Sequence, residues 1–135
     1  MKKHVLLIIC LFAFSILNAQ TLGENELVGT WKVVHVLNKE NNGYLKEFMK
    51  SFETAIIEFR QSHEFKLTSE HNSPIFKMFT DKTKNSMWKY SADKKISIGN
   101  SVDHFSLLKI FANIENNKII FTFEETPIRL EVQKM

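Results

Sequence analysis

Apolar residues recur at every second position along much of this chain, in short runs separated by polar turns. Ile57 and Phe59 flank a glutamate in one such run, and Ile96 and Ile98 flank a serine in another. Two-residue alternation is typical of strands that bury one face. The pattern predicts strands at residues 28–38, 54–60, 64–70, 74–80, 87–91, 94–100, 105–114, 118–125 and 128–134.

The connections between these strands are short and polar, which predicts that neighbours in sequence pair with each other. We expect residues 74–80 to form an irregular edge strand, since Pro74 cannot donate to a ladder. One-sided strands joined in sequence order form an antiparallel meander. An open meander leaves two exposed edges, so closure is favoured. We therefore predict an all-β fold: an antiparallel up-and-down β-barrel of 8–9 strands.

One segment has a different period. Tyr44, Phe48 and Phe52 recur every four residues, and lysine and glutamate occupy positions between them. This spacing predicts one short amphipathic helix between the first and second strands, with Asn41 or Asn42 as its N-cap. Its apolar stripe needs a surface to cover. The helix is interpreted either as a lid over the open end of the barrel or as an element packed on the outer wall.

The first twenty residues differ from the rest of the chain. Lys2 and Lys3 precede an apolar run at residues 5–17, and Ala19 supplies the small side chain that signal peptidase requires. These parts in this order are typical of a secretory signal peptide, with cleavage near Ala19–Gln20. The run is shorter than the ~20 residues of a permanent membrane span.

We therefore expect residues 1–19 to be a cleaved signal peptide and residues 20–135 to form a single domain. The protein is expected in the periplasm or the extracellular medium, without a stable membrane anchor. A lipoprotein signal at Cys10 is the alternative, but Ile9 stands where such a signal requires a small residue. The oligomeric state stays open, and a monomer is assumed.

Removal of the signal changes the charge of the chain. Without Lys2 and Lys3, 16 of the 18 basic residues remain against 15 acidic ones, so the net charge falls from +3 to about +1. A general attraction to nucleic acid is therefore not expected. Cys10 is the only cysteine and leaves with the signal, so the mature domain has no disulfide or thiolate chemistry.

The opening stretch of the mature chain carries a recognisable motif. The "GTW" of Gly29 and Trp31 resembles the Gly-x-Trp signature of the lipocalins. The segments "AIIEFRQSHEFKL", "MWKYSADKKISI" and "IIFTFEETPIRLEVQK" resemble strand pairs of the bacterial lipocalin-like domain family, within the calycin superfamily. "GTWK" also resembles the fatty-acid-binding proteins, in which a helical pair follows the first strand and an export signal is lacking.

The resemblance implies roles for these residues. In such barrels the tryptophan seals the base, the glycine lets the backbone pass closely, and a basic residue near the last strand covers the indole. Arg129 and Lys134 are the candidates for that basic residue by position. Alternation places Arg129 on the outer face, opposite Leu130, and we assign the covering role to Arg129.

The sequence contains no recognisable catalytic constellation. It has no Gly-x-Ser-x-Gly, no phosphate-binding loop and no His-Glu-x-x-His. His35 is placed by alternation on the face of Trp31, where a hydrogen-bonded core histidine is the ordinary interpretation. We therefore predict a protein that is not an enzyme, with no catalytic residues, no metal site and no cofactor.

The interior of the barrel remains as the candidate site. Eight strands enclose a space that side chains fill or that holds one small ligand. The residues predicted to line it are aromatic: Phe59, Phe65, Trp88, Tyr90, Phe105, Phe111, Phe121 and Phe123. The first hypothesis is an exported lipocalin-like protein that binds a small hydrophobic ligand non-covalently. The alternative is a filled-barrel interaction or inhibitor protein of the cell envelope, which acts through its loops.

Overall fold

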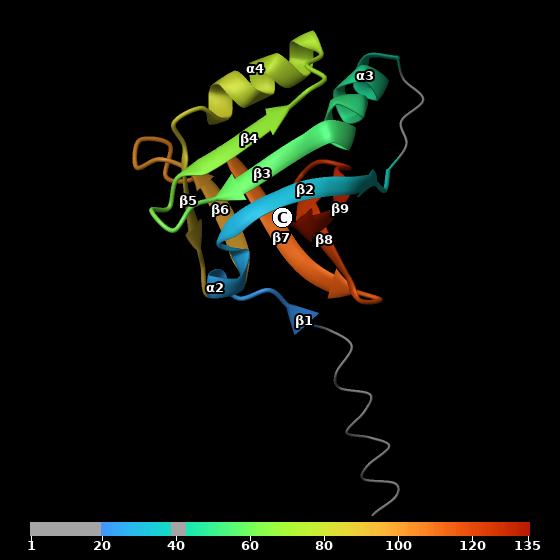
Figure 1. Ribbon diagram of the computed structural model, residues 1–135. Helices are drawn as coiled ribbons and strands as arrows, with labels where there is room; N and C mark the ends of the chain where they lie inside the picture. The colour runs from blue at the N-terminus through green and yellow to red at the C-terminus, as the bar shows by residue number, and fades with distance from the viewer. Residues whose placement is uncertain (1–19, 39–42) are drawn as a thin grey trace, which may run out of the picture.

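The computed structural model describes residues 20–38 and 43–135 (Figure 1). The predicted signal peptide and the two candidate N-cap residues lie outside the described residues. The elements are β1 (Gln20–Thr21), α2 (Glu24–Leu27), β2 (Gly29–Val36), α3 (Gly43–Ser51), the 3-10 helix η1 (Phe52–Thr54), β3 (Ala55–Phe59), β4 (Phe65–Ser69), α4 (Pro74–Thr83), β5 (Met87–Tyr90), β6 (Lys95–Gly99), β7 (Leu108–Glu115), β8 (Lys118–Phe123) and β9 (Arg129–Lys134).

The strands form one antiparallel sheet that curls into a nearly closed barrel. The order of the eight long strands is β4-β3-β2-β9-β8-β7-β6-β5. Neighbours in this order are also neighbours in sequence, apart from the β2–β9 pair that joins the two halves. The predicted all-β, up-and-down barrel is therefore confirmed, and so is the short helix after the first long strand.

The last gap in the barrel lies between β4 and β5. A single bridge, Glu64 to Met87, joins the two strands. It is held by hydrogen bonds from the Phe65 amide to the Ser86 carbonyl (3.0 Å) and from the Trp88 amide to the His63 carbonyl (2.7 Å). Beyond this bridge the strands diverge, because α4 is inserted between them.

The segment at residues 74–80 is helical, so its prediction as an edge strand is wrong. Ser73 caps α4, its hydroxyl accepting a hydrogen bond from the Phe76 amide at 3.2 Å. Pro74 occupies the first turn, where the missing amide hydrogen costs nothing. Phe76 and Phe79 lie three residues apart and face the core. The serine-proline pair before an apolar run was the signal for a helix start.

Alternation gives the correct buried face for most strands, but not for all. In β7 the buried residues are Leu108, Ile110 and Ala112. Phe105 precedes the strand, in a turn where its φ is +55°. Phe111 faces outward, half-buried, with the Lys95 ammonium 5.4 Å from its ring centre. These two residues therefore do not line the interior as predicted.

The pairing of β2 with β9 changes register partway along β2. The pairing with β9 slips between Val33 and His35, which is a β-bulge. A bulge inserts one residue and reverses which side chains face inward. His35 consequently points outward, with its side chain 67% exposed and 3.9 Å from the Glu131 carboxylate.

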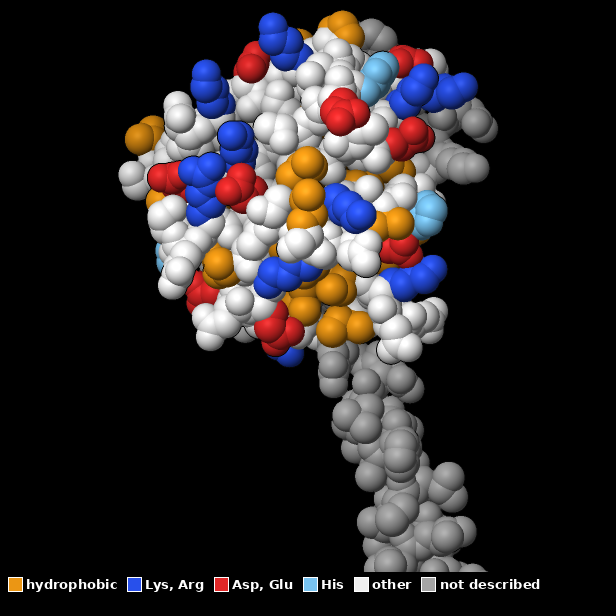
Figure 2. Space-filling view, in the orientation of Figure 1, with side chains coloured by type: hydrophobic (Ala, Val, Ile, Leu, Met, Phe, Trp, Pro, Cys, Tyr) orange, Lys and Arg blue, Asp and Glu red, His pale blue; other side chains and the backbone are white. Residues whose placement is uncertain are grey.

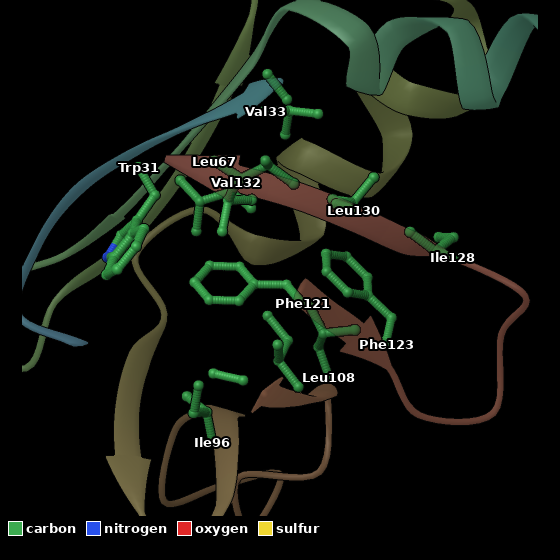
Figure 3. Packing of buried hydrophobic residues seen from close by; sticks show 14 of the residues in the cluster. Trp31, Val33, Leu67, Ile96, Leu108, Phe121, Phe123, Ile128, Leu130 and Val132 are labelled. Carbon is green, nitrogen blue, oxygen red and sulfur yellow. The ribbon is translucent and has the colours of Figure 1, made fainter. Parts of the chain in front are cut away.

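The core runs through the whole barrel. Phe121 and Phe123 of β8 project into the centre, where they meet Leu108 of β7 and Leu130 of β9 (Figure 3). Trp31 lies toward one end of this cluster and Ile128 toward the other. Residues 20–38 and 43–135 contain no cysteine, so apolar burial, and not a disulfide, is the main source of their stability.

Candidate functional site

Four of the predicted ligand-binding residues form a close-packed cluster of tilted and edge-to-face aromatic rings inside the barrel. The ring of Phe59 lies 5.6 Å from Phe65, 5.5 Å from Trp88 and 5.9 Å from Phe121, measured between ring centres. All four residues are buried. The indole Nε1 of Trp88 donates to the Arg60 carbonyl at 2.9 Å. These four rings pack against one another and form part of the hydrophobic core.

The remaining predicted lining residues have separate positions. Tyr90 uses its hydroxyl to hold the N-terminal segment, donating to the Leu22 carbonyl at 3.0 Å. Phe105 and Phe111 lie outside the core cluster, under the ammonium groups of Lys89 and Lys95 respectively. Phe123 differs from these predicted lining residues, because it lies where the hydrophobic core contacts the helices.

The Gly-x-Trp motif closes one end of the barrel. Trp31 is 1% exposed, and its Nε1 donates to the Leu27 carbonyl at the end of α2 at 2.9 Å. The Lys134 ammonium lies 5.5 Å from the centre of the indole and donates to the Glu26 carbonyl at 2.9 Å. Lys134 is therefore the residue that covers the tryptophan.

The assignment of this role to Arg129 is wrong. Arg129 pairs with the Glu115 carboxylate at 2.8 Å. It begins β9, whereas Lys134 ends it, and Lys134 is the residue opposite Trp31 in the β2–β9 ladder. Position along the strand, not the direction of alternation, decides which basic side chain reaches the indole.

Gly29 is required by the same arrangement. Its φ is +142°, and a Cβ built on it would lie 2.6 Å from Cε of Lys134. We expect Gly29→Ala to lower the free energy of unfolding by about 1–3 kcal/mol, since the backbone is strained and the lysine is displaced from the indole. Urea denaturation measures this loss. Gly43→Ala is the control, because nothing lies within 4 Å of its added methyl group.

The opposite end of the barrel carries an apolar hollow of about 300 Å³, here called the mouth pocket. It lies between α3, one side chain of α4 and the loop that joins β8 to β9. Its lining residues are Leu45, Phe48, Met49, Phe79, Phe123, Glu125, Thr126, Pro127 and Ile128. The β2–β9 register places this loop beside Val36, far from the tryptophan end.

The predicted lid helix forms one wall of this pocket. Phe48 lines the pocket, and Phe52 lies behind it, fully buried, with its ring centre 5.7 Å from that of Phe123. The side chain of Tyr44 lies outside the described residues. Leu45, on the same helix, lines the pocket while remaining 41% exposed. α3 thus covers the end of the barrel without sealing it.

Buried hydroxyl groups fix the two helices that frame the pocket. The Ser51 hydroxyl donates to the Glu47 carbonyl at 3.1 Å and accepts from the Ser73 amide at 3.2 Å. The Ser69 hydroxyl donates to the Ser51 carbonyl at 2.5 Å. This network joins the end of α3, the end of β4 and the start of α4. The two helices that frame the pocket are therefore joined to each other and to the sheet.

A larger hollow, of about 640 Å³, lies where β4 and β5 diverge. Charged and polar side chains line much of it, among them Arg60, Glu64 and Lys84. The hydrogen bond to Glu58, and then that to Glu64, raises the pKa of the Arg60 guanidinium. The Arg60 guanidinium and the Glu64 carboxylate are already paired with each other at 2.9 Å. The mouth pocket, whose lining is mostly apolar, is therefore the better candidate for an apolar ligand.

The residues with described positions include no group of three or more histidine, cysteine, aspartate or glutamate side chains arranged to hold a metal ion. Among the helices that the structure describes, none has the length and apolarity to cross a membrane. No family model matches this chain, and no curated protein or solved structure matches it.

Proposed function

We propose that this protein binds a small apolar molecule non-covalently in the mouth pocket, as an exported lipocalin-like binding protein. The proposed export depends on the signal-like segment at residues 1–19, and the proposed relationship depends on the Gly-x-Trp motif. The site differs from the one expected from sequence. It lies at the end of the barrel, beneath α3, because aromatic rings occupy the centre.

The observation that carries this proposal is the apolar lining of an open hollow. Apolar side chains in contact with water are unfavourable, so a concave apolar surface with a fixed frame is typical of a binding site. Charges on the visible face are of mixed sign, with blue and red side chains interspersed (Figure 2). That face therefore has no large patch of one charge sign that would favour a polyanion or a polycation over a small apolar ligand.

Uptake of a neutral fluorescent probe, phenylnaphthylamine, by the delipidated mature domain tests this function. We expect saturable binding, and we expect Leu45→Gln to weaken it about tenfold through loss of apolar contact. Leu37→Gln is the matched control, since Leu37 is 44% exposed and does not line the pocket. Native mass spectrometry of protein purified from its own compartment should show retained ligand mass.

The filled core also supports a second candidate function, an interaction protein that acts through its loops. Val102, in the loop between β6 and β7, is 87% exposed. If delipidated protein takes up no probe, or if both leucine variants weaken uptake equally, ligand binding in the mouth pocket is excluded and this second function is favoured.

A further inference from the structure

A second apolar hollow, of about 400 Å³, adjoins the mouth pocket on the surface of the helices. Phe48 of α3 and Phe79 of α4 line both hollows, and their ring centres lie 5.9 Å apart in an edge-to-face arrangement. Ile75 and Met78 continue the apolar lining along α4, and Met78 is 62% exposed. The two hollows therefore form one elongated apolar strip that crosses a pair of aromatic rings.

The two ends of this strip differ in charge. Lys82 is the single charged side chain that lines the second hollow, and Glu125 is the single charged side chain that lines the mouth pocket. Among the described residues, Lys82 has no ion-pair partner. Glu125 forms no ion pair among them either. The pKa of the nearby Lys95 is raised mainly by its hydrogen bond to Glu124, and the charge of Glu125 makes the smallest contribution.

We propose that the ligand is an anionic amphiphile whose chain crosses the rings of Phe48 and Phe79 and whose head group meets Lys82. This inference rests on the proposed function, since it specifies the ligand of the same site. A carboxylate or phosphate head group at Lys82 can form an ion pair with a lysine that has no other ion-pair partner among the described residues. The same group beside Glu125 is repelled by the negative charge of that carboxylate. The apolar chain then lies toward the β8–β9 loop.

The division of the strip into two hollows by a ring pair favours a flexible chain over a rigid ring system. A flexible chain can bend over the rings and occupy both hollows. A rigid polycyclic molecule fits one hollow and leaves the other empty. Fatty-acid carboxylates and the phosphate head groups of lipids share the required chemistry, and the experiment below separates them.

Three soluble probes with the same alkyl chain test the head group: decanoate, decanol and decyltrimethylammonium. Each is titrated into the delipidated domain loaded with phenylnaphthylamine, and displacement is measured. We expect decanoate to bind about three- to fivefold more tightly than decanol, as one exposed ion pair allows. The cationic probe should bind more weakly than decanol.

The charge variants identify the residue responsible. Lys82→Gln should remove the preference for decanoate over decanol, measured as the ratio of their two dissociation constants. Lys77→Gln, on the same helix and lining neither hollow, should retain the preference. Equal binding of decanoate and decanol by the unaltered protein, with Leu45→Gln still weakening both, overturns this inference and leaves the proposed function intact.

Vesicles separate a monomeric amphiphile from a membrane surface. The protein is sedimented with phosphatidylcholine vesicles that contain phosphatidylglycerol. We expect it to stay in the supernatant while binding monomeric decanoate. Sedimentation with the vesicles, together with no displacement by monomeric decanoate, overturns the inference, because the helical face then serves as a membrane-contact surface. If all three soluble probes fail to displace phenylnaphthylamine, although Leu45→Gln weakens its saturable binding, the inference is overturned and the proposed function stands. If Leu45→Gln does not weaken that binding, the proposed function itself is contradicted.

Discussion

Replacement of Trp31 by alanine should lower the free energy of unfolding by about 3–5 kcal/mol. The indole is 1% exposed and packs 5.4 Å from the ring of Phe121, so its removal leaves a cavity in a close-packed core. The Leu27 carbonyl loses its donor at the same time, and Lys134 loses the ring beneath it. A domain of this size is stable by about 5–15 kcal/mol, so a large share is lost.

Guanidinium denaturation measures this effect. Unfolding is followed by far-ultraviolet circular dichroism of the backbone, since the fluorescence of Trp31 is lost in the variant. Trp31→Phe is the control: it keeps an apolar ring and loses the Leu27 hydrogen bond, and we expect it to cost about 2 kcal/mol. A loss below 1 kcal/mol for the alanine variant would show that the indole does not seal this end of the barrel.

The architecture was predictable because most strands carry apolar residues at every second position only, so that one face is apolar and the other polar. In β3 the buried residues are Ala55, Ile57 and Phe59, and the partly exposed ones alternate with them. Such a strand has one arrangement that buries its apolar side chains. The same holds for β4, in which Phe65 and Leu67 are buried between exposed polar residues.

The face of β7 was not predictable because its sequence is apolar in both phases. Leu107 and Phe111 lie in one phase, and Leu108, Ile110 and Ala112 lie in the other. The larger rings suggested the first phase. The structure buries the second set, and Phe105 lies before the strand in a turn with positive φ. Side-chain size alone therefore does not identify the buried face of a strand that is apolar on both faces.

The mouth pocket had only a partial signal in the sequence. Its helical wall was visible as the four-residue spacing of Phe48 and Phe52. Its other walls come from Phe79, on a helix that was predicted as a strand, and from residues 125–127, a loop without any period. A site assembled from a misassigned helix and an irregular loop depends on tertiary packing, which two-residue and four-residue periods do not describe.

Phe52 connects the helices to the barrel, and its replacement by alanine should also cost about 3–5 kcal/mol. The residue is fully buried at the start of η1. Its ring centre lies 5.3 Å from Phe48 of α3, 5.0 Å from Phe76 of α4 and 5.7 Å from Phe123 of β8. Removal of this ring deprives both pocket-forming helices of their common contact. Urea denaturation measures the total loss.

Amide hydrogen exchange distinguishes local loosening from uniform destabilisation. In Phe52→Ala we expect the amides of α3 to exchange faster than the global stability change requires, because Phe48 of α3 packs 5.3 Å from this ring. The β8–β9 ladder should follow the global change alone. Phe52→Leu, which keeps most of the apolar volume, should cost about 1.5 kcal/mol or less and leave α3 protected. Equal acceleration in α3 and in the β8–β9 ladder would show that the helix is anchored by other contacts, and the pocket would then not depend on Phe52.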